Sequence, residues 1–284
     1  YILFLTIIIS STSVFARNVI MIDVDEGIGP ATASYIENSI EQAEEENAEA
    51  LIIRLNTPGG LLEATRDIVS VMMEARVPVV VYVAPGGARA GSAGVFITLA
   101  SNIAAMAPGT NIGAAHPVGI GGQADTSSVM FDKVTNDAAA FVRSIAQRRG
   151  RNEEWAERAV RESISASENE ALEAGAIDLI AMNVDSLLAR IDSMTVETAA
   201  GEETLQTADV RIIKREKNWR ETLLGILADP NFAYIFMMLA IYGIMFELYN
   251  PGAIFPGVIG GISAILAAYS MQMLPVNYAG LALI

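Results

Sequence analysis

The chain has 284 residues, which is enough for one sizeable domain and a smaller appendage. The absence of cysteine excludes a disulfide framework, a thiolate nucleophile and a cysteine-ligated metal. The formal net charge of −15 repels nucleic acid and argues against a polynucleotide partner. Apolar residues make up 52% of the chain, and they are concentrated at its two ends.

The first residues predict a secretory signal peptide. An apolar run over 1–9 is followed by small residues and by Val14, Phe15 and Ala16, a pattern that favours cleavage after Ala16. The run is too short to span a bilayer comfortably. A buried first strand is the alternative. We therefore expect 1–16 to be a signal peptide and the domain that follows to lie outside the cytoplasm.

Between the two ends, short apolar runs alternate with segments of helical periodicity. Runs rich in β-branched and apolar residues predict strands over 18–24, 50–55, 77–83 and 103–106. Helical spacing predicts helices over 32–46, 61–75, 92–100 and 134–149, and a helix pair over 153–174. The segment 119–128 has no apolar periodicity and is expected to be a loop. This β-α order predicts an α/β domain with parallel strands.

The C-terminal part of the chain predicts membrane spans. Apolar stretches over 232–249 and 254–273 flank a tight break at Asn250, Pro251 and Gly252. Each is close to the roughly 20 residues that cross a bilayer. A buried helical hairpin is the alternative. A further apolar stretch starts at Ala279, so we expect the natural chain to continue.

The segment before these spans is polar and then amphipathic. We expect a linker or hairpin over 195–207 and a helix over 218–227 that lies on the membrane surface. The predicted organisation is a signal peptide (1–16), an α/β domain (17–195), a linker with a juxtamembrane segment (196–230) and a partial transmembrane domain (231–284). Four basic residues before the first span favour a cytoplasmic location instead, although whole domains translocate largely regardless of charge; they are Lys214, Arg215, Lys217 and Arg220.

Two glycine-rich turns, over 56–60 and 85–94, each follow a predicted strand. Glycine allows a backbone to approach a ligand closely. Ser92 lies between Gly91 and Ala93 at the start of an apolar helix, where a developing oxyanion would meet backbone N–H groups. Ser92 is therefore a candidate nucleophile, and the alternative is that it only caps the helix. Neither turn has the spacing of a nucleotide-binding loop.

A serine nucleophile needs a base, and the chain offers few. His116 is the single histidine, and Lys133 opens the apolar helix that follows the predicted loop. A lysine there could be partly desolvated, and an amine must fall from about 10.4 to about 7–8 in pKa to act as a base near neutral pH. The alternative is an ordinary surface lysine. No cluster has metal-ligand spacing, so we expect neither a metal nor a cofactor.

Several segments together resemble the NfeD family of membrane-bound serine proteases, relatives of the Clp protease and of signal peptide peptidase A. They begin with Asn-Thr-Pro-Gly-Gly (56–60) and Ala-Arg-Ala-Gly-Ser-Ala-Gly (88–94), and they include the "His-Pro" context of His116. The remaining segments are 104–118, 132–136, 144–147, 150–152, 170–178 and 247–252. The resemblance extends over nearly the whole chain.

The resemblance implies a Clp/crotonase-like spiral of β-β-α units followed by a helical transmembrane region. It implies a Ser–Lys dyad of Ser92 and Lys133, with an oxyanion hole formed by backbone N–H groups of Gly59, Gly60 and Ala93. Such donors typically lower a barrier by about 3–4 kcal/mol each. It further implies a multi-pass membrane endopeptidase, at least dimeric, that cleaves hydrophobic segments of stomatin- or flotillin-like membrane proteins.

Three alternatives remain open at this stage. A Clp-type protease would use His116 as the base, with Glu162 in the region of the family's acid. A catalytically silent scaffold of membrane microdomains would need neither Ser92 nor Lys133. An acyl-CoA enzyme of the crotonase fold would share the oxyanion hole, but export would separate it from CoA. Apolar residues near the candidate site suit either a peptide-binding cleft or a core; they are Val95, Phe96, Ile112, Met130 and Phe131.

Overall fold

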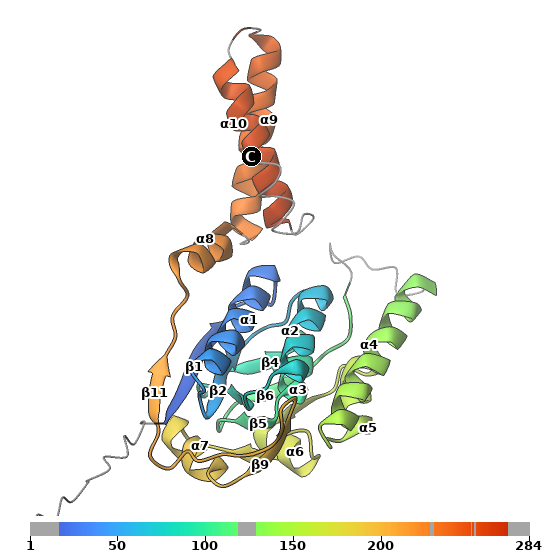
Figure 1. Ribbon diagram of the computed structural model, residues 1–284. Coiled ribbons are helices and arrows are strands. Elements are labelled where there is room, and N and C mark those ends of the chain that lie inside the picture. Colours follow the sequence, from blue (N-terminus) through green and yellow to red (C-terminus); the bar gives the residue numbers. More distant parts are fainter. Residues whose placement is uncertain (1–16, 119–128, 228–229, 251, 253, 272–284) are drawn as a thin grey trace, which may run out of the picture.

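The computed structural model describes residues 17–118, 129–227, 230–250, 252 and 254–271. The predicted signal peptide and the predicted loop over 119–128 lie outside the described residues. Figure 1 shows a domain of sheet and helices from which a helical hairpin projects.

The domain is built on a six-stranded sheet in the order β11-β1-β2-β3-β5-β8, with every neighbouring pair parallel. In its register Val19 lies opposite Ala50, and Leu51 lies opposite Val79. The four strands that the sequence predicts are present within two residues of their predicted ends. The strands are β1 (Asn18–Asp25), β2 (Ala50–Asn56), β3 (Val79–Val83), β5 (Ile103–Met106), β8 (Leu179–Ile180) and β11 (Arg211–Lys214).

Both faces of this sheet are buried. Successive side chains along its central strands point to opposite faces and lie in two different hydrophobic cores. Leu51 and Ile53 belong to the larger core, which also contains the helix residues Ile36 and Val142. Ala50 and Ile52 belong to a second core on the other face. Burial on two faces explains why the central strands are largely apolar runs in the sequence, with β3 apolar throughout.

The helices of the domain follow the strands, as expected for parallel crossovers. Gly150 has a φ of 66° two residues after the end of the longest one, which confirms the predicted stop there. Asn152 and Ser167 cap the two helices that were predicted as a pair. The helices are α1 (Pro30–Glu45), α2 (Leu62–Glu74), α3 (Ala93–Ala100), α4 (Val129–Arg148), α5 (Glu153–Arg161), α6 (Glu168–Glu173) and α7 (Val184–Ile191).

A second, three-stranded sheet lies beside the first and was not predicted. It contains β4 (Arg89–Gly91), β6 (Asn111–Gly113) and β7 (Ser165–Ser167) in the order β4-β6-β7. The chain therefore runs from a long strand through a short strand to a helix twice in succession, as β3-β4-α3 and as β5-β6-α4. These are the β-β-α units that the family resemblance implied.

The domain extends beyond residue 195, where the sequence analysis ended it. The hairpin that was one of the two predictions for 195–207 is present as β9 (Thr195–Thr198) and β10 (Gly201–Thr204). In the predicted linker that follows, β11 pairs with β1. The main sheet thus reaches Lys214. The sequence did not indicate this strand because only Ile212 and Ile213 are apolar, and both are half-buried at the sheet edge.

Three helices complete the described chain: α8 (Trp219–Leu227), α9 (Pro230–Tyr249) and α10 (Ile254–Ser270). The span Phe232–Tyr249 of α9 has a mean hydropathy of 1.7 and is long and apolar enough to cross a membrane, while α10 is apolar and shorter. A Cβ on Gly243 would lie 2.6 Å from the carbonyl oxygen of Pro256 and 2.8 Å from Cα of Gly260. Small residues therefore allow close packing of the hairpin, as in membrane helix pairs.

Candidate active site

Three turns meet at the edge of the main sheet where its parallel strands end. The turn after β1 binds the turn after β2, with the Ile28 N–H donating to the Gly59 carbonyl at 2.8 Å. The turn after β2 also binds β4, because the Thr57 N–H donates to Arg89 at 2.8 Å and the Gly91 N–H donates to Thr57 at 3.0 Å. The Pro-Gly-Gly turn is therefore held from both sides. Carboxyl ends of parallel strands are the usual place for ligands in such folds.

Ser92 lies between β4 and α3 in a strained conformation. Its φ of 48° and ψ of −107° match the first central position of a type II′ turn, which glycine usually occupies. Its N–H donates to the carbonyl of Gly113 at 3.0 Å, so β6 holds it in place. Ser92 occupies the N-cap position of α3, but its side chain makes no capping hydrogen bond. The hydroxyl is thus not used as a helix cap, and non-glycine strain of this kind is concentrated at functional sites.

Gly59 packs directly against this serine. A Cβ built on Gly59 would lie 2.6 Å from Cβ and 3.2 Å from Oγ of Ser92, and its φ of +125° is accessible to glycine. The Gly59 N–H donates to Oγ1 of Thr57 at 3.1 Å in this structure. Gly59 thus lies against the candidate nucleophile, but its N–H is already hydrogen-bonded to Thr57 and does not point freely at a substrate oxygen.

Thr57 is a residue of this site that the sequence analysis did not single out. Its backbone joins the turn to β4, and its hydroxyl closes the turn on Gly59. A signal was available, because threonine hydroxyls commonly bond to backbone two residues further along a turn.

Lys133 lies in the second turn of α4, and its side chain is exposed. The partial desolvation expected from the sequence is therefore not provided by the described residues. Phe131, two residues earlier, contacts the ring of His116 with 5.3 Å between centroids. The two candidate bases thus lie close to the same turn of α4.

The arrangement around His116 differs from a Clp-type triad. Nδ1 of His116 lies 2.8 Å from the Val160 carbonyl, which can only accept, so this nitrogen carries the proton. Glu162, the candidate acid, instead pairs with Arg158 at 2.9 Å on the exposed side of α5. A carbonyl can orient an imidazole, but Glu162 does not complete a triad with His116.

The apolar residues near the site divide into two groups. Val95, Phe96 and Ile112 are buried in the larger core, so they form core rather than cleft. Met130 is 68% exposed and Phe131 is half-buried. Val118, which follows the His-Pro segment, is 85% exposed. An apolar surface for a peptide is therefore available at Met130 and Val118.

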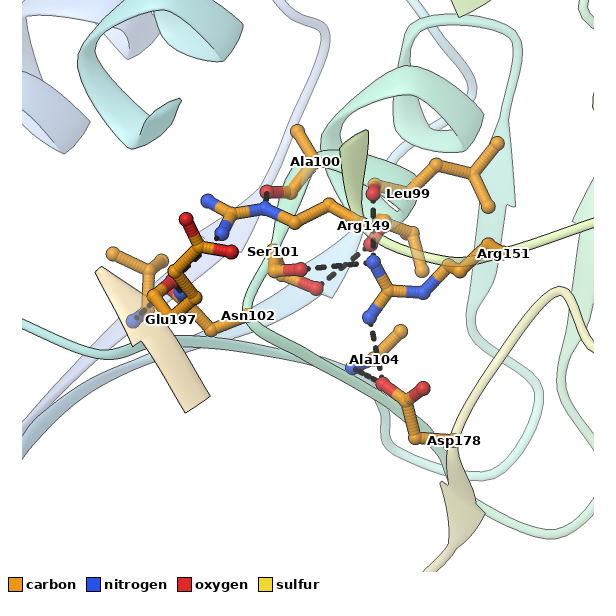
Figure 2. Close-up of polar contacts among 11 residues, drawn as sticks. Leu99, Ala100, Ser101, Asn102, Ala104, Arg149, Arg151, Asp178 and Glu197 are labelled. Carbon is orange, nitrogen blue, oxygen red and sulfur yellow. Dashed lines mark hydrogen bonds and ion pairs between the residues drawn. The ribbon is translucent and has the colours of Figure 1, made fainter. Parts of the chain in front are cut away.

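The far end of α3 is held by two arginines that follow α4 (Figure 2). Arg149 Nε donates to the Ala100 carbonyl at 2.7 Å. Arg151 Nη1 donates to the carbonyls of Leu99 at 2.7 Å and Ser101 at 2.9 Å. These contacts satisfy carbonyls that a helix C-terminus leaves unpaired, and the positive charges suit that end of the helix dipole.

Arg151 is also buried against an acid. Its side chain is 2% exposed, and Nη2 lies 2.6 Å from the Asp178 carboxylate. Burial lowers the pKa of Arg149 to about 10, with Arg151 and Arg148 adding to the effect, so Arg149 stays charged at neutral pH. Because both arginines follow α4, they fix the end of α3 relative to the end of α4. Arg151 and Asp178 both lie in segments that resemble the family, but no pattern in the sequence indicated a role for either residue.

The comparison with known families decides the identity. The family description "NfeD1b, N-terminal domain" matches residues 18–209, and "NfeD integral membrane domain" matches residues 231–284. The chain belongs to the NfeD family. The resemblance that the sequence motifs indicated is thereby confirmed, and the NfeD chain is a membrane protein.

Two curated relatives cover most of this NfeD chain. It is 34% identical over 285 residues to membrane-bound protease PH1510 of Pyrococcus horikoshii, a match to 99% of this chain and 64% of that protein. It is 28% identical over 258 residues to membrane protein NfeD1b of Bacillus subtilis, a match to 89% of this chain and 56% of that protein. The chain thus spans about three fifths of the length of these relatives.

Solved structures confirm the predicted fold class. One is a lysine-to-alanine variant of the 1510-N membrane-bound stomatin-specific protease with a substrate peptide, at 32% identity and a TM-score of 0.69, covering 75% of this chain and 98% of that one. Another is a serine-to-alanine variant of the same protease, at 34% identity and a TM-score of 0.67, covering 72% of this chain and 99% of that one. The α/β domain of the NfeD chain therefore has the Clp-like fold.

Proposed function

We propose that this chain is a membrane-anchored serine endopeptidase in which Ser92 is the nucleophile and Lys133 is the base. One observation carries the proposal: Ser92 has glycine-type backbone angles, does not cap its helix with its hydroxyl, and packs against Gly59. The substrates we propose are apolar segments of stomatin- or flotillin-like proteins, in keeping with the stomatin-specific relative.

The altered residues of that relative support the dyad. The lysine and the serine replaced by alanine in its two structures are separated by the same number of residues as Ser92 and Lys133. The lysine variant of that protease was obtained in complex with a substrate peptide, which is compatible with a catalytic role for its lysine. A scaffold would need neither residue, and no observation favours the acyl-CoA alternative.

The proposed dyad assigns each residue a step in the reaction. The neutral amine of Lys133 accepts the Ser92 proton as Oγ attacks the peptide carbonyl carbon. The oxyanion that forms is stabilised by the N–H groups of Gly60 and Ala93, and by Gly59 once its N–H leaves Thr57. The lysine then returns the proton to the departing amine, leaving an acyl-serine that water hydrolyses with the same amine as base.

The exposure of Lys133 has a consequence for this mechanism. A bound peptide that covers Lys133 would exclude water from its amine and favour the neutral form that the reaction needs. The exposed apolar side chains of Met130 and Val118 lie within three residues of Lys133 and His116 along the chain, where an apolar segment would contact them. We therefore expect apolar peptides to be cleaved faster than charged ones.

Four substitutions test the dyad, with peptide cleavage and labelling by a fluorophosphonate probe as measurements. Ser92→Ala should lose both cleavage and labelling. Lys133→Ala should lose cleavage almost as completely, because members of one catalytic unit are not additive. Lys133→Arg should also fail, since a guanidinium cannot accept the proton. His116→Ala should retain substantial activity.

The result that contradicts the dyad is the reverse order, with His116→Ala inactive and Lys133→Ala active. The pH profile separates the two bases independently. A lysine base predicts a rate that still rises above pH 7, whereas an imidazole base is already neutral by about pH 7.5–8. Unchanged thermal unfolding of each variant is the control for folding.

We further propose that the catalytic domain lies outside the cytoplasm, that the protein crosses the membrane more than once, and that it is at least a dimer. The signal-peptide pattern of 1–16 motivates the orientation. Because the chain has no cysteine, a single Glu46→Cys substitution on the exposed end of α1 provides a unique label. Intact cells should react at this cysteine with a membrane-impermeant maleimide. Reaction only after lysis would place the domain in the cytoplasm.

A further inference from the structure

The short helix α8 presents an apolar face that the other described residues leave about half exposed or more. Trp219 is 71% exposed, and Leu223 and Ile226 are each 46% exposed. Their spacing of four and then three residues places them on one face of the helix. The guanidinium of Arg220 lies 5.3 Å from the Trp219 ring, so a cation accompanies this apolar face. We call Trp219, Leu223 and Ile226 the α8 stripe.

The opposite face of α8 is polar and fastened to the catalytic domain. Glu221 is buried there and pairs with Arg215 at 2.7 Å, while Asn38 of α1 donates to it at 2.9 Å. Burial alone would raise the pKa of Glu221, but hydrogen bonds from Arg215, Asn38 and Asn218 outweigh it and lower the pKa. The carboxylate is therefore charged at neutral pH. This is the reverse of a soluble-protein surface helix, in which the apolar face is the buried one.

The helix is also joined to the membrane hairpin. The Tyr269 hydroxyl of α10 donates to the Leu224 carbonyl at 3.4 Å, and the Ser270 hydroxyl donates to the Leu227 carbonyl. Figure 1 shows α8 at the foot of the α9–α10 hairpin, between the hairpin and the catalytic domain. The α8 stripe thus lies beside the start of the helix that is long enough to span a membrane.

The same helix lies at the catalytic edge of the sheet. All strands of the main sheet are parallel, so the chain leaves β11 toward α8 at the edge where β2 leads into the Pro-Gly-Gly turn. Lys217, just before α8, pairs at 2.6 Å with Glu26, which follows β1. Two residues on, Ile28 binds Gly59 and so reaches the turn that packs against Ser92.

We propose that the α8 stripe lies in the interface of the lipid bilayer and holds the catalytic edge of the domain toward the membrane surface. The occupant is lipid because α8 continues into a membrane span and carries a tryptophan, aliphatic side chains and an arginine. Tryptophan and arginine are suited to the headgroup level, and aliphatic side chains to the acyl boundary. Apolar segments that emerge from the bilayer would then reach Ser92 without leaving the surface.

The first test measures the depth of α8 in a membrane. Single-cysteine variants Leu223→Cys and Ile226→Cys of the full chain carry a spin label in phosphatidylcholine vesicles, with Glu46→Cys at the other end of the domain as the matched control. For each label we take the ratio of its relaxation by oxygen to its relaxation by a water-soluble nickel chelate. This ratio should be several-fold higher for both α8 labels than for the control label. The two should also lie at similar depth, since the helix lies along the surface.

Three outcomes overturn the proposal. Water-like accessibility at both α8 positions shows a solvated helix. A depth that increases from Leu223 to Ile226 shows a continuation of the span. Exclusion of both reagents with spin–spin broadening shows that a second copy covers the stripe.

The second test measures orientation. A fluorophore on Met130→Cys, at the start of α4, should transfer energy more efficiently to an acceptor on lipid headgroups than one on Glu46→Cys. Equal or lower transfer would overturn the orientation. Neither readout depends on proteolysis, so failure here is distinguishable from failure of the proposed function.

Discussion

The two ends of helix α3 differ in how their polar groups are used. At the N-terminal end, Ser92 has a φ of 48°, and its hydroxyl makes no capping hydrogen bond to the helix. At the C-terminal end, Leu99, Ala100 and Ser101 have carbonyls that accept hydrogen bonds from buried or half-buried arginines (Figure 2). The helix is therefore positioned by contacts at the end opposite the proposed nucleophile. This arrangement allows a strained residue with an uncommitted side chain to persist at the other end.

The strongest way to break this arrangement is to remove Arg151. Arg151→Met should lower the free energy of unfolding by about 3–5 kcal/mol, because Asp178 and two carbonyls lose a buried charged partner. Denaturant unfolding of the detergent-solubilised chain measures the change.

The matched control is Arg148→Met at the end of α4. Both side chains of its ion pair with Glu197 are exposed, so the free energy of unfolding should fall by less than about 1 kcal/mol. Equal losses for the two variants would show that burial of Arg151 does not matter.

At the N-terminal end of α3, the effect of packing against Ser92 can be tested by changing Gly59. Gly59→Ala should lower the cleavage rate by about a hundredfold, because its Cβ would displace Ser92, and a shift of about 1 Å can cost this much. Rate measurements on a short apolar peptide provide the value.

Gly87→Ala is the control for backbone strain. Gly87 also has a positive φ, of 88°, but a Cβ there would meet no atom within 4 Å. It should lose stability without losing cleavage rate. If both variants cleave equally slowly, strain in the glycine turns, and not contact with Ser92, accounts for the loss.

The smallest effect concerns the strain at Ser92 itself. Ser92→Gly and Ser92→Ala both remove the hydroxyl, but glycine adopts a φ of 48° at lower energy. Ser92→Gly should therefore be more stable than Ser92→Ala by about 1 kcal/mol. Thermal unfolding of the two inactive variants compares them directly. A lower stability for Ser92→Gly would mean that the backbone at this position is not strained.

The main sheet was largely predictable because its strands are buried on both faces. The runs that became β1, β2, β3 and β5 are mostly apolar, and periodicity also predicted the helices between them. The short strands β4, β6 and β7 were missed, since three residues carry no readable period. Yet β4 and β6 are the strands that hold Ser92.

The sequence by itself determined the four longest central strands and the helices between them, the apolar C-terminal segments, the family motifs and the candidate residues Ser92 and Lys133. These are local properties: burial leaves apolar runs, helices leave a period, and glycine marks turns. Only the tertiary structure decided that Gly59 packs against Ser92, that the Gly113 carbonyl holds the Ser92 N–H, and that Arg151 anchors the other end of α3. Each of these contacts joins residues far apart in the chain, and no local pattern records which distant backbone groups folding will bring into hydrogen-bonding distance.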